Sequence, residues 1–292
     1  MVRSVSTGTV RAMSLPTLMD LIKRSTDYLV SHGITNARRE AEWIFAETLG
    51  LTRMDLYTRF DMPIEEVEVG RLRGLVQRRG RREPLAYVLG SQEFCALRLT
   101  IGPGVLVPRP ETEELVERVR KSLPATPVRV LDVGTGSGAI ALALKQQRGD
   151  CVIEATDISQ EALTIARANG ERLGLSVVWH HGHLAQPVQG SFTAVVANLP
   201  YIGEGERGEC DPELAFEPAS ALFAEADGMA LIRELLSDAK RLLAHDGVMW
   251  LEHGWRQGDA VRRASAAHGL TCEILRDLAG KDRFARVAQE TT

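Results

Sequence analysis

Short apolar segments alternate with amphipathic ones in the second half of the chain, and this alternation constrains the fold more than any other feature. The predicted strands are residues 128–133, 152–156, 192–197 and 248–251, with a further strand beginning at residue 177, and the predicted helices are residues 138–145, 161–173 and 229–243. Short apolar strands separated by amphipathic helices are typical of a mostly parallel sheet that is covered on both faces. The sequence therefore predicts an α/β fold with its ligand site beyond the carboxyl ends of the strands.

The first third of the chain predicts a different architecture. Apolar residues recur at helical spacing in four segments between residues 15 and 82, with Ser14 as the expected cap of the first helix. From residue 85 to 107 the period changes to two, which predicts a β-hairpin with a strand at residues 87–89 and a turn at Gly90 and Ser91. A chain of 292 residues is long for one domain, so two domains are expected.

Four segments follow from these patterns. They are a disordered leader at residues 1–13, a helical domain at 14–83, a β-hairpin linker at 84–108 and the α/β domain at 109–292. The leader contains arginine, serine and threonine but no acid, so a transit peptide is the alternative interpretation. Six arginines gather near the end of the fourth helix, between residues 71 and 82, either as a solvated face at a helix C-terminus or as a nucleic-acid patch.

Composition excludes several classes of protein. The net charge of −4 gives no reason to expect a binder of polyanions, and no apolar run reaches the length of a membrane span. The four cysteines lie far apart and form no CxxC pair, which argues against a zinc site and a disulfide framework and favours the cytoplasm. His180, His181 and His183 lack nearby cysteine or aspartate partners, so we expect no bound metal.

A glycine-rich loop directly follows the first predicted strand. The loop consists of Gly134, Thr135, Gly136, Ser137 and Gly138. Glycines at alternate positions let the backbone turn tightly and lie flat against a ligand, and the next helix points its free N–H groups at the same spot. The second strand ends at Asp157, whose carboxylate can accept both ribose hydroxyls of a nucleoside cofactor. Loop and acid together predict such a cofactor, although a dinucleotide-dependent dehydrogenase satisfies the same pattern.

The fourth predicted strand runs directly into Asn198, Leu199, Pro200 and Tyr201. An amide nitrogen is a poor nucleophile, so a methyltransferase must hold its NH₂ group by accepting its hydrogens. The side-chain oxygen of Asn198 and a backbone carbonyl of Leu199 or Pro200 provide such acceptors, and proline removes a competing donor. Tyr201 supplies a flat wall for a planar acceptor. This tetrad indicates methyl transfer to an amide or an aromatic amine, with Asn198, Pro200 and Tyr201 as the catalytic residues.

From about residue 15 onward the sequence resembles the HemK-type protein-(glutamine-N5) methyltransferases, which modify peptide chain release factors. The matching segments are residues 83–90, 93–94, 106–113, 131–141, 198–202, 252–254 and 282–284. The resemblance implies a Rossmann-like class I methyltransferase domain preceded by a small helical bundle and a β-hairpin linker. It also implies S-adenosyl-L-methionine as cofactor and S-adenosyl-L-homocysteine as product. Residues 134–138, Asp157 and Asn198 would contact the cofactor, and residues 198–201 the glutamine.

Two positions depart from the family pattern. The second position of the tetrad is usually proline and is Leu199 here, and the acid common after the third strand is replaced at Gly182-His183-Leu184. An adenine contact from that acid cannot be carried over. A sister family acting on ribosomal protein L3 typically has Arg-Ser-Pro where this chain has Arg109-Pro110-Glu111, which favours the release-factor branch.

An N6-adenine nucleic-acid methyltransferase is the main alternative because it uses a similar tetrad, and a non-catalytic cofactor-binding module is another. An acidic segment after Tyr201 argues against nucleic acid, since it would repel phosphates and suit a basic protein partner. Its acids are Glu204, Glu206, Glu209, Asp211, Glu213 and Glu217. We therefore expect a protein substrate, no direct nucleic-acid contact and no membrane partner, with the helical domain recognising the substrate.

Overall fold

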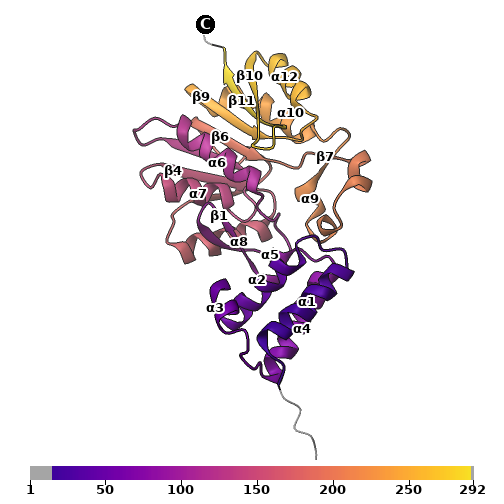
Figure 1. Cartoon of the computed structure of the whole chain (residues 1–292). Helices are drawn as coiled ribbons and strands as arrows, with labels where there is room; N and C mark the ends of the chain where they lie inside the picture. The colour runs from indigo at the N-terminus through magenta and orange to yellow at the C-terminus, as the bar shows by residue number, and fades with distance from the viewer. Residues whose placement is uncertain (1–14, 291–292) are drawn as a thin grey trace, which may run out of the picture. The chain divides into compact units, whose positions relative to one another are not determined.

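The computed structural model describes residues 15–290, and the predicted leader and Ser14 lie outside this range. The chain divides into two compact units, with the division between residues 89 and 90. The first unit is helical (Figure 1). Its helices are α1 (Leu18–Ser31), α2 (Ala37–Leu49), α3 (Arg53–Thr58), α4 (Glu66–Gly80) and α5 (Leu85–Leu89). The predicted bundle is therefore present, with a fifth short helix added.

Local sequence explains where these helices begin and end. The side chain of Thr17 accepts a hydrogen bond from the backbone N–H of Asp20 and caps α1, a role that we had assigned to Ser14. Gly50 ends α2 in the left-handed conformation. Of the arginines near the end of α4, Arg78 pairs with Glu83 and Arg79 pairs with Glu40. These two arginines are committed to contacts inside the unit, which argues against a nucleic-acid patch at these positions, although Arg79 is buried and so is not part of a solvated face either.

The predicted hairpin is only partly correct. Residues 85–89 form α5 and not a strand, because the backbone N–H groups of Tyr87 and Val88 bond to the carbonyl of Pro84. The hairpin consists of β1 (Ser91–Phe94) and β2 (Leu97–Thr100), paired antiparallel. Its turn lies at Cys95 and Ala96, both at positive φ, and not at residues 90 and 91. Cys95 and Ala96 are not typical turn formers, whereas Gly90 and Ser91 are. For this reason the sequence pattern indicates the wrong position for the turn.

The second unit contains a seven-stranded sheet in the order β10-β11-β9-β6-β3-β4-β5. Its strands are β3 (Arg129–Val133), β4 (Val152–Asp157), β5 (Val178–His181), β6 (Phe192–Asn198), β9 (Leu243–Glu252), β10 (Leu270–Arg276) and β11 (Asp282–Gln289). Adjacent strands from β9 to β5 pair in parallel, and β11 pairs antiparallel with both of its neighbours. The predicted α/β class is confirmed, and the two C-terminal strands were not predicted.

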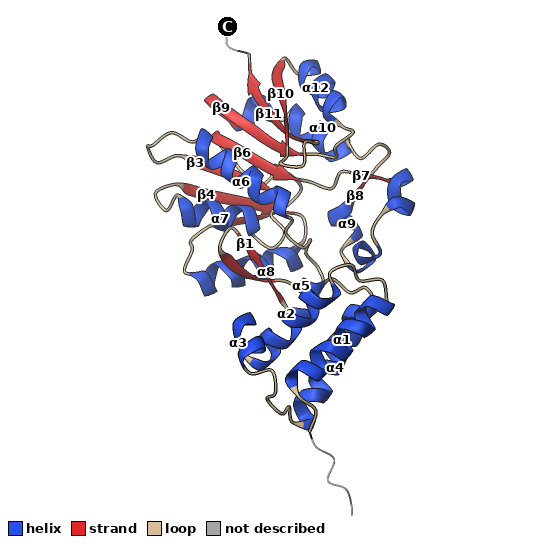
Figure 2. Ribbon diagram, in the orientation of Figure 1, coloured by secondary structure: helices blue, strands red, loops and turns tan. Residues whose placement is uncertain are grey.

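Helices cover both faces of the sheet (Figure 2). Helices α6 (Pro110–Ser122) and α7 (Ala139–Gln147) pack together, α7 against β3 and β4 and α6 against β6 and β9. Helices α10 (Ala230–Ser237), α11 (Ala239–Leu242) and α12 (Gly258–Ala267) join a large apolar cluster with β3, β6 and β9. Helix α8 (Gln160–Leu173) follows β4. The chain turns from β5 back across β3 to reach β6, so a topological switch point lies beside β3.

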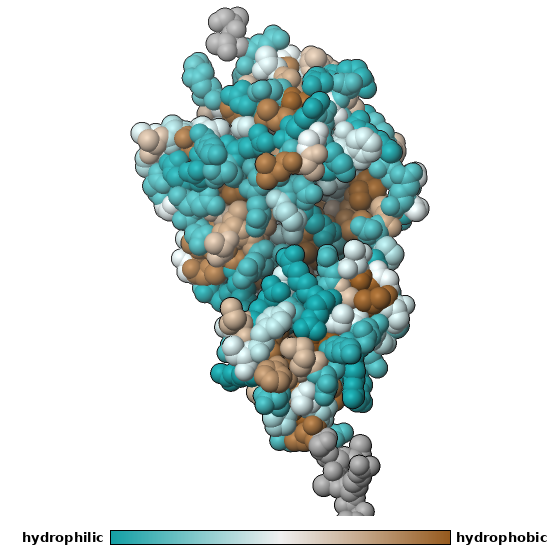
Figure 3. Space-filling view, in the orientation of Figure 1, coloured by the Kyte–Doolittle hydropathy of each residue, from teal (hydrophilic) through white to brown (hydrophobic). Residues whose placement is uncertain are grey.

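A long excursion connects β6 to α10. It contains β7 (Ile202–Gly203), the 3-10 helices η1 (Glu204–Glu209) and η2 (Pro212–Phe216), α9 (Ala219–Leu222) and β8 (Phe223–Ala224). Strands β7 and β8 pair in parallel and bring the two ends of the excursion together. On the face drawn in Figure 3, hydrophilic residues predominate and hydrophobic residues form separate patches. Within residues 15–290, no helix combines the length and apolar character that a membrane span needs.

Candidate active site

A cavity of about 540 Å³ lies in the second unit at the carboxyl ends of β3, β4 and β6. This volume is in the range of sites that hold small molecules and cofactors. Eight of the predicted site residues line it: Gly134, Thr135, Gly136, Ser137, Asp157, Asn198, Leu199 and Pro200. The segment before α6, the end of the 202–224 excursion and the start of α10 complete the wall. The sheet topology therefore gathers the glycine loop, the acid and the first three tetrad residues at one cavity.

The glycine loop lies close to the tetrad. Gly134 has a φ of +75°, and a Cβ added there would lie 2.9 Å from Cδ2 of Leu199. The backbone N–H groups of Gly134 and Thr135 both donate to the carbonyl of Thr156, each at 2.9 Å. Leu199 thus occupies the space that a Cβ at position 134 would need, so the glycine lets the tetrad pack against the loop.

Gly138 has a different role from the other loop glycines. It does not line the cavity, and a Cβ added there would lie 3.1 Å from side-chain atoms of Leu142 and Trp179. It occupies the N-cap of α7 at a φ of +83°, in the left-handed region that glycine favours. Gly138 therefore lets the end of the loop pack closely against the core, and its predicted contact with a cofactor stays a prediction.

Asp132 bonds to the glycine loop from the buried side, a role that the sequence analysis did not predict. The residue is fully buried, and its Oδ2 accepts hydrogen bonds from the Thr135 hydroxyl at 2.6 Å and the Ala141 N–H at 3.1 Å. Its Oδ1 is buried without a partner. Burial raises the pKa of this carboxyl to about 7, against the lowering effect of the two hydrogen bonds. Its position at the end of a buried strand, directly before the loop, was the available signal.

Asp157 is fixed by the backbone at the cavity wall. Its Oδ2 accepts from the N–H of Gly136 and its Oδ1 from the N–H of Ser159, each at 2.8 Å. Burial raises the pKa of the Asp157 carboxyl, while these hydrogen bonds lower it. Each carboxylate oxygen retains further lone pairs. The carboxylate therefore orders the loop and can still accept hydrogens from a ligand in the cavity.

The tetrad begins at the last residue of β6. Asn198, Leu199 and Pro200 line the cavity, whereas Tyr201 does not and packs against the apolar cluster of the second unit. The Tyr201 hydroxyl lies 3.5 Å from Oε1 of Glu252, at the outer limit of a hydrogen bond. The structure thus brings the first three residues together at the cavity and turns the tyrosine toward the last residue of β9.

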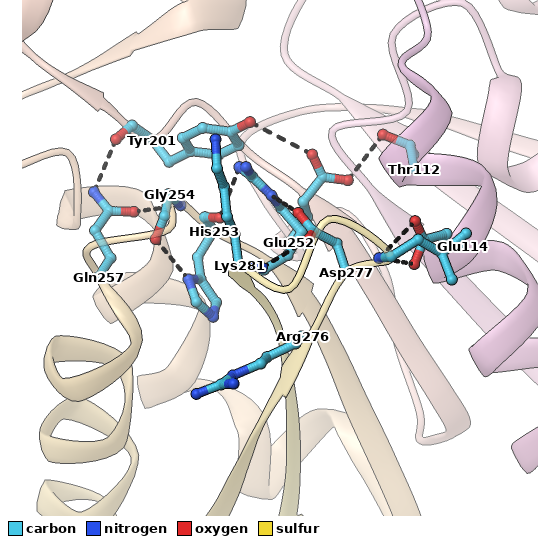
Figure 4. Close-up of polar contacts among 12 residues, drawn as sticks. Thr112, Glu114, Tyr201, Glu252, His253, Gly254, Gln257, Arg276, Asp277 and Lys281 are labelled. Atoms are coloured by element: carbon cyan, nitrogen blue, oxygen red, sulfur yellow. Dashed lines mark hydrogen bonds and ion pairs between the residues drawn. The ribbon is translucent and has the colours of Figure 1, made fainter.

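A chain of buried hydrogen bonds supports Asn198 from behind. The Asn198 Nδ2 donates to the Thr112 hydroxyl at 3.0 Å, and this hydroxyl donates to Oε2 of Glu252 at 2.8 Å. Figure 4 shows Glu252 between Thr112 of α6 and Tyr201. Thr112 and Glu252 are both buried. Burial raises the pKa of the Glu252 carboxyl to about 7 and also raises the pKa of the Tyr201 hydroxyl.

Sequence comparison identifies both units. Residues 20–90 match the family described as the PrmC N-terminal domain, and residues 110–214 match the methyltransferase small domain. A release factor glutamine methyltransferase of Geobacter sulfurreducens is 37% identical over 270 residues, which cover 91% of this chain and 95% of that protein. The chain belongs to the release factor glutamine methyltransferase family. The resemblance seen in the sequence is confirmed, and the chain is a methyltransferase, which excludes the dehydrogenase and the non-catalytic module.

Other relatives extend this result. The protein of the same name in Neisseria gonorrhoeae is 42% identical over 248 residues, 84% of this chain and 90% of that protein. The catalytic domain of hMettl16 shares the fold with a TM-score of 0.52 and 15% identity, over 77% of this chain and 82% of that one. A methyltransferase from Pyrococcus furiosus has a TM-score of 0.50 and 19% identity, over 65% of this chain and 87% of that one. The Rossmann-like methyltransferase fold is confirmed.

The cavity fits the type of cofactor that methyltransferases of this fold use, which is S-adenosylmethionine. The loop leaves room for a ligand at Gly136, because nothing lies within 4 Å of a Cβ added there. The first turn of α7 follows directly and directs N–H groups toward the loop. Asp157 faces the same cavity with spare acceptor capacity. Glycine loop, helix N-terminus and carboxylate are together compatible with a cofactor of this type.

Gln257 is a further residue that the sequence analysis missed. Its Nε2 donates to the backbone carbonyl of Tyr201 at 2.8 Å, and its Oε1 accepts from the N–H of Gly254 at 2.8 Å (Figure 4). The same Nε2 also donates to the backbone carbonyl of Asp227 at 2.9 Å. Three backbone segments converge on this one buried carboxamide. Gln257 therefore fixes the backbone where the tetrad ends. No local motif indicated it, since two of its three partners, Tyr201 and Asp227, are remote in sequence.

The acidic segment differs from its prediction in one respect. Glu217 is buried, pairs with Arg109 and accepts a hydrogen bond from the N–H of Val107 at 2.9 Å. Glu217 therefore connects the 202–224 excursion to the segment before α6, and it is not part of an acidic surface. The exposed acids of this segment are Glu204, Glu206, Glu209 and Asp211. A smaller negative surface thus remains on η1 and directly after it.

The three histidines near the end of β5 have separate partners. His180 lies 2.9 Å from Glu154, His181 bonds to the carbonyl of Ile158, and His183 lies 2.9 Å from Glu234. No group of three or more potential metal-ligating side chains occurs among the residues that the structure describes. His183 and Glu234 both line the cavity. His183 belongs to the segment after β5 in which members of the family commonly have an acid.

Proposed function

We propose that this chain transfers a methyl group from S-adenosyl-L-methionine to the side-chain amide nitrogen of a glutamine in a peptide chain release factor. The glutamine is that of the Gly-Gly-Gln motif, the nitrogen is N5, and the product cofactor is S-adenosyl-L-homocysteine. The names of the relatives support this substrate, because they match over most of their own length as well as that of this chain. Transfer in the cytoplasm is part of the proposal.

The orientation of Asn198 is the structural observation that supports an amide acceptor most directly. Its NH₂ group is already committed to Thr112, so Oδ1 is the group that Asn198 can present to the cavity. Oδ1 can accept one hydrogen of the substrate NH₂, and a carbonyl of Leu199 or Pro200 can accept the other. Two such hydrogen bonds orient the amide nitrogen so that its lone pair points toward the reactive methyl group.

The reaction then needs position more than acid–base chemistry. The nitrogen lone pair forms the new N–C bond as the S–C bond of the sulfonium breaks, and one N–H proton leaves to solvent because a methylated amide cation is strongly acidic. Holding the two reactants in line supplies about 7–11 kcal/mol of the barrier reduction when the geometry is good. Asn198 and Pro200 would act in this way, and Tyr201 would support the turn from its packed position rather than as a proton donor.

The remaining parts of the chain have proposed roles in substrate recognition. Residues 14–83 would bind the body of the release factor, residues 84–108 would link the units, and residues 109–292 would perform the transfer. The exposed acids from Glu204 to Asp211 would face a cationic loop of the factor. No direct contact with nucleic acid is part of this function.

Mass spectrometry of a release factor incubated with the enzyme and S-adenosyl-L-methionine tests the proposal. We expect a gain of one methyl group, located on the glutamine of the Gly-Gly-Gln motif, and no gain when that glutamine is alanine. Ribosomal protein L3 and adenine-containing DNA serve as parallel substrates. Methylation of either one in preference to the release factor would assign a different acceptor to the same site.

A further inference from the structure

The hydrogen-bond chain behind Asn198 can be read for the direction of each proton. The Thr112 hydroxyl has a single hydrogen and is placed between two partners, Glu252 and Asn198, at 2.8 and 3.0 Å. An ionised carboxylate only accepts hydrogen bonds, so it takes the Thr112 hydrogen. The hydroxyl can then only accept from its other partner. That partner must present its NH₂ group, and Asn198 Oδ1 is left for the cavity.

A protonated Glu252 would remove this constraint. Its own O–H could donate to the Thr112 hydroxyl, which would release the hydroxyl hydrogen toward Asn198. The Asn198 carboxamide could then satisfy Thr112 with either its NH₂ or its oxygen. If the Asn198 oxygen bonds to Thr112, the Asn198 NH₂ group faces the NH₂ group of the substrate. Two hydrogen-bond donors cannot bond to each other, so the substrate amide would not be held.

We propose that Thr112 and Glu252 are positioning residues that fix the orientation of the Asn198 carboxamide, with an ionised Glu252 as the active form. The inference rests on the proposed methylation of an amide, because it assigns the group that holds that amide. Glu252 does not line the cavity, whereas Thr112 does. The inferred effect of both residues on turnover is the orientation of Asn198, to which Thr112 bonds directly and Glu252 through Thr112.

The surroundings of Glu252 place its titration within the working range of an enzyme. Burial, with a smaller contribution from Glu111 of α6, raises the pKa of the Glu252 carboxyl to about 7, against the lowering effect of the Thr112 and Tyr201 hydroxyls and of Arg283 of β11. His253, next in the chain, has its pKa lowered by burial. Arg283 itself binds the Asp277 carboxylate and the carbonyl of His253. As pH falls, Glu252 would therefore become protonated, and the orientation of the Asn198 carboxamide would no longer be fixed.

The test compares four variants of the full chain acting on a release factor. Thr112→Val keeps the shape and removes the hydroxyl, whereas Thr112→Ser restores it. Glu252→Gln removes the charge. Ser122→Ala is the matched control, because Ser122 also connects α6 to β9 by accepting a hydrogen bond from Nε1 of Trp250, at 3.2 Å, but has no link to Asn198. Calorimetry of S-adenosyl-L-methionine binding and thermal melting verify that each variant is folded.

We expect Thr112→Val to lower kcat about tenfold or more, with the cofactor Kd within twofold of wild type and Thr112→Ser within threefold. Wild type and Ser122→Ala should lose kcat as pH falls through about 7, and Thr112→Val and Glu252→Gln should not show this loss. A Thr112→Val enzyme within threefold of Ser122→Ala would overturn the inference. If Thr112→Val does not fold, an acid limb retained in Glu252→Gln would overturn it. A wild-type enzyme that leaves the release factor unmethylated would instead refute the proposed function.

Discussion

Asp157 offers the sharpest test of how the cofactor is held, because two roles for it predict different thermodynamics. Its carboxylate accepts hydrogen bonds from the backbone N–H groups of Gly136 and Ser159, each at 2.8 Å, and it also lines the cavity. In one role it only orders the glycine loop. In the other it also accepts the two ribose hydroxyls. Asp157→Ala should weaken cofactor binding in both cases, so the loss alone does not separate them.

Removing the hydroxyls from the ligand does separate the two roles. A hydrogen bond to a charged group contributes about 1.5–3 kcal/mol, which corresponds to roughly a 10- to 150-fold change in Kd for each hydroxyl that bonds to the carboxylate. Calorimetry would compare S-adenosylhomocysteine with its 2′,3′-dideoxy analogue on wild type and on Asp157→Ala. We expect a large penalty for the analogue on wild type and little or none on the variant. Equal penalties on both proteins would leave Asp157 as a loop-ordering residue alone, and an unchanged Kd for Asp157→Ala would remove it from the site altogether.

Four further expectations follow from the structure. Asn198→Ala should lose most of kcat, by about 1–3 kcal/mol in transition-state stabilisation, with the melting temperature little changed; turnover within threefold of wild type would refute its role. Tyr201→Phe should be mild, since the hydroxyl makes one contact at 3.5 Å, and Tyr201→Ala severe, since the ring packs in the core; equal inactivity of both variants would indicate proton transfer. A fragment of residues 90–292 should bind the cofactor yet methylate the intact factor poorly, by calorimetry and mass spectrometry. The carboxyl groups of Asp132 and Glu252 both have pKa values raised to about 7, so each binds its proton more tightly in the folded than in the unfolded chain. The stability that this contributes is full below about pH 4 and is lost as pH rises through about 7. The melting temperature should therefore fall between about pH 4 and 7, and it should fall less in Asp132→Asn.

Much of the second unit could be predicted because its signals are local. The strands that end at Val133, Asp157 and Asn198 are short apolar runs, and each is followed at once by a residue with a recognisable chemistry. Parallel topology then places all three ends at one edge of the sheet. The sequence thus places the glycine loop, the acid and the start of the tetrad at one edge of the sheet, and in the structure all of them except Gly138 line one cavity.

The failures occurred where tertiary contacts override local pattern. Residues 85–89 alternate like a strand but become helical because Pro84 begins a turn whose Ala86, Tyr87 and Val88 are all buried. The edge strand β10 mixes exposed and half-buried positions and shows no clean apolar run. Glu217 was grouped with its acidic neighbours, although its partner Arg109 lies 108 residues away and draws it into the interior.

The support of Asn198 was missed for a reason that concerns strand order rather than motif recognition. Glu252 was visible in the sequence at the end of a predicted strand, and Thr112 within a segment typical of the family. What the sequence did not reveal is that β6 and β9 are neighbours, in a register that sets Asn198 opposite Glu252. A buried polar side chain such as Glu252 nearly always has a hydrogen-bond partner, and Asn198 lies beside it at the ends of these parallel strands. Thr112, which reaches the same edge from α6, bonds to both, so strand adjacency alone would have been enough to ask which residue does so.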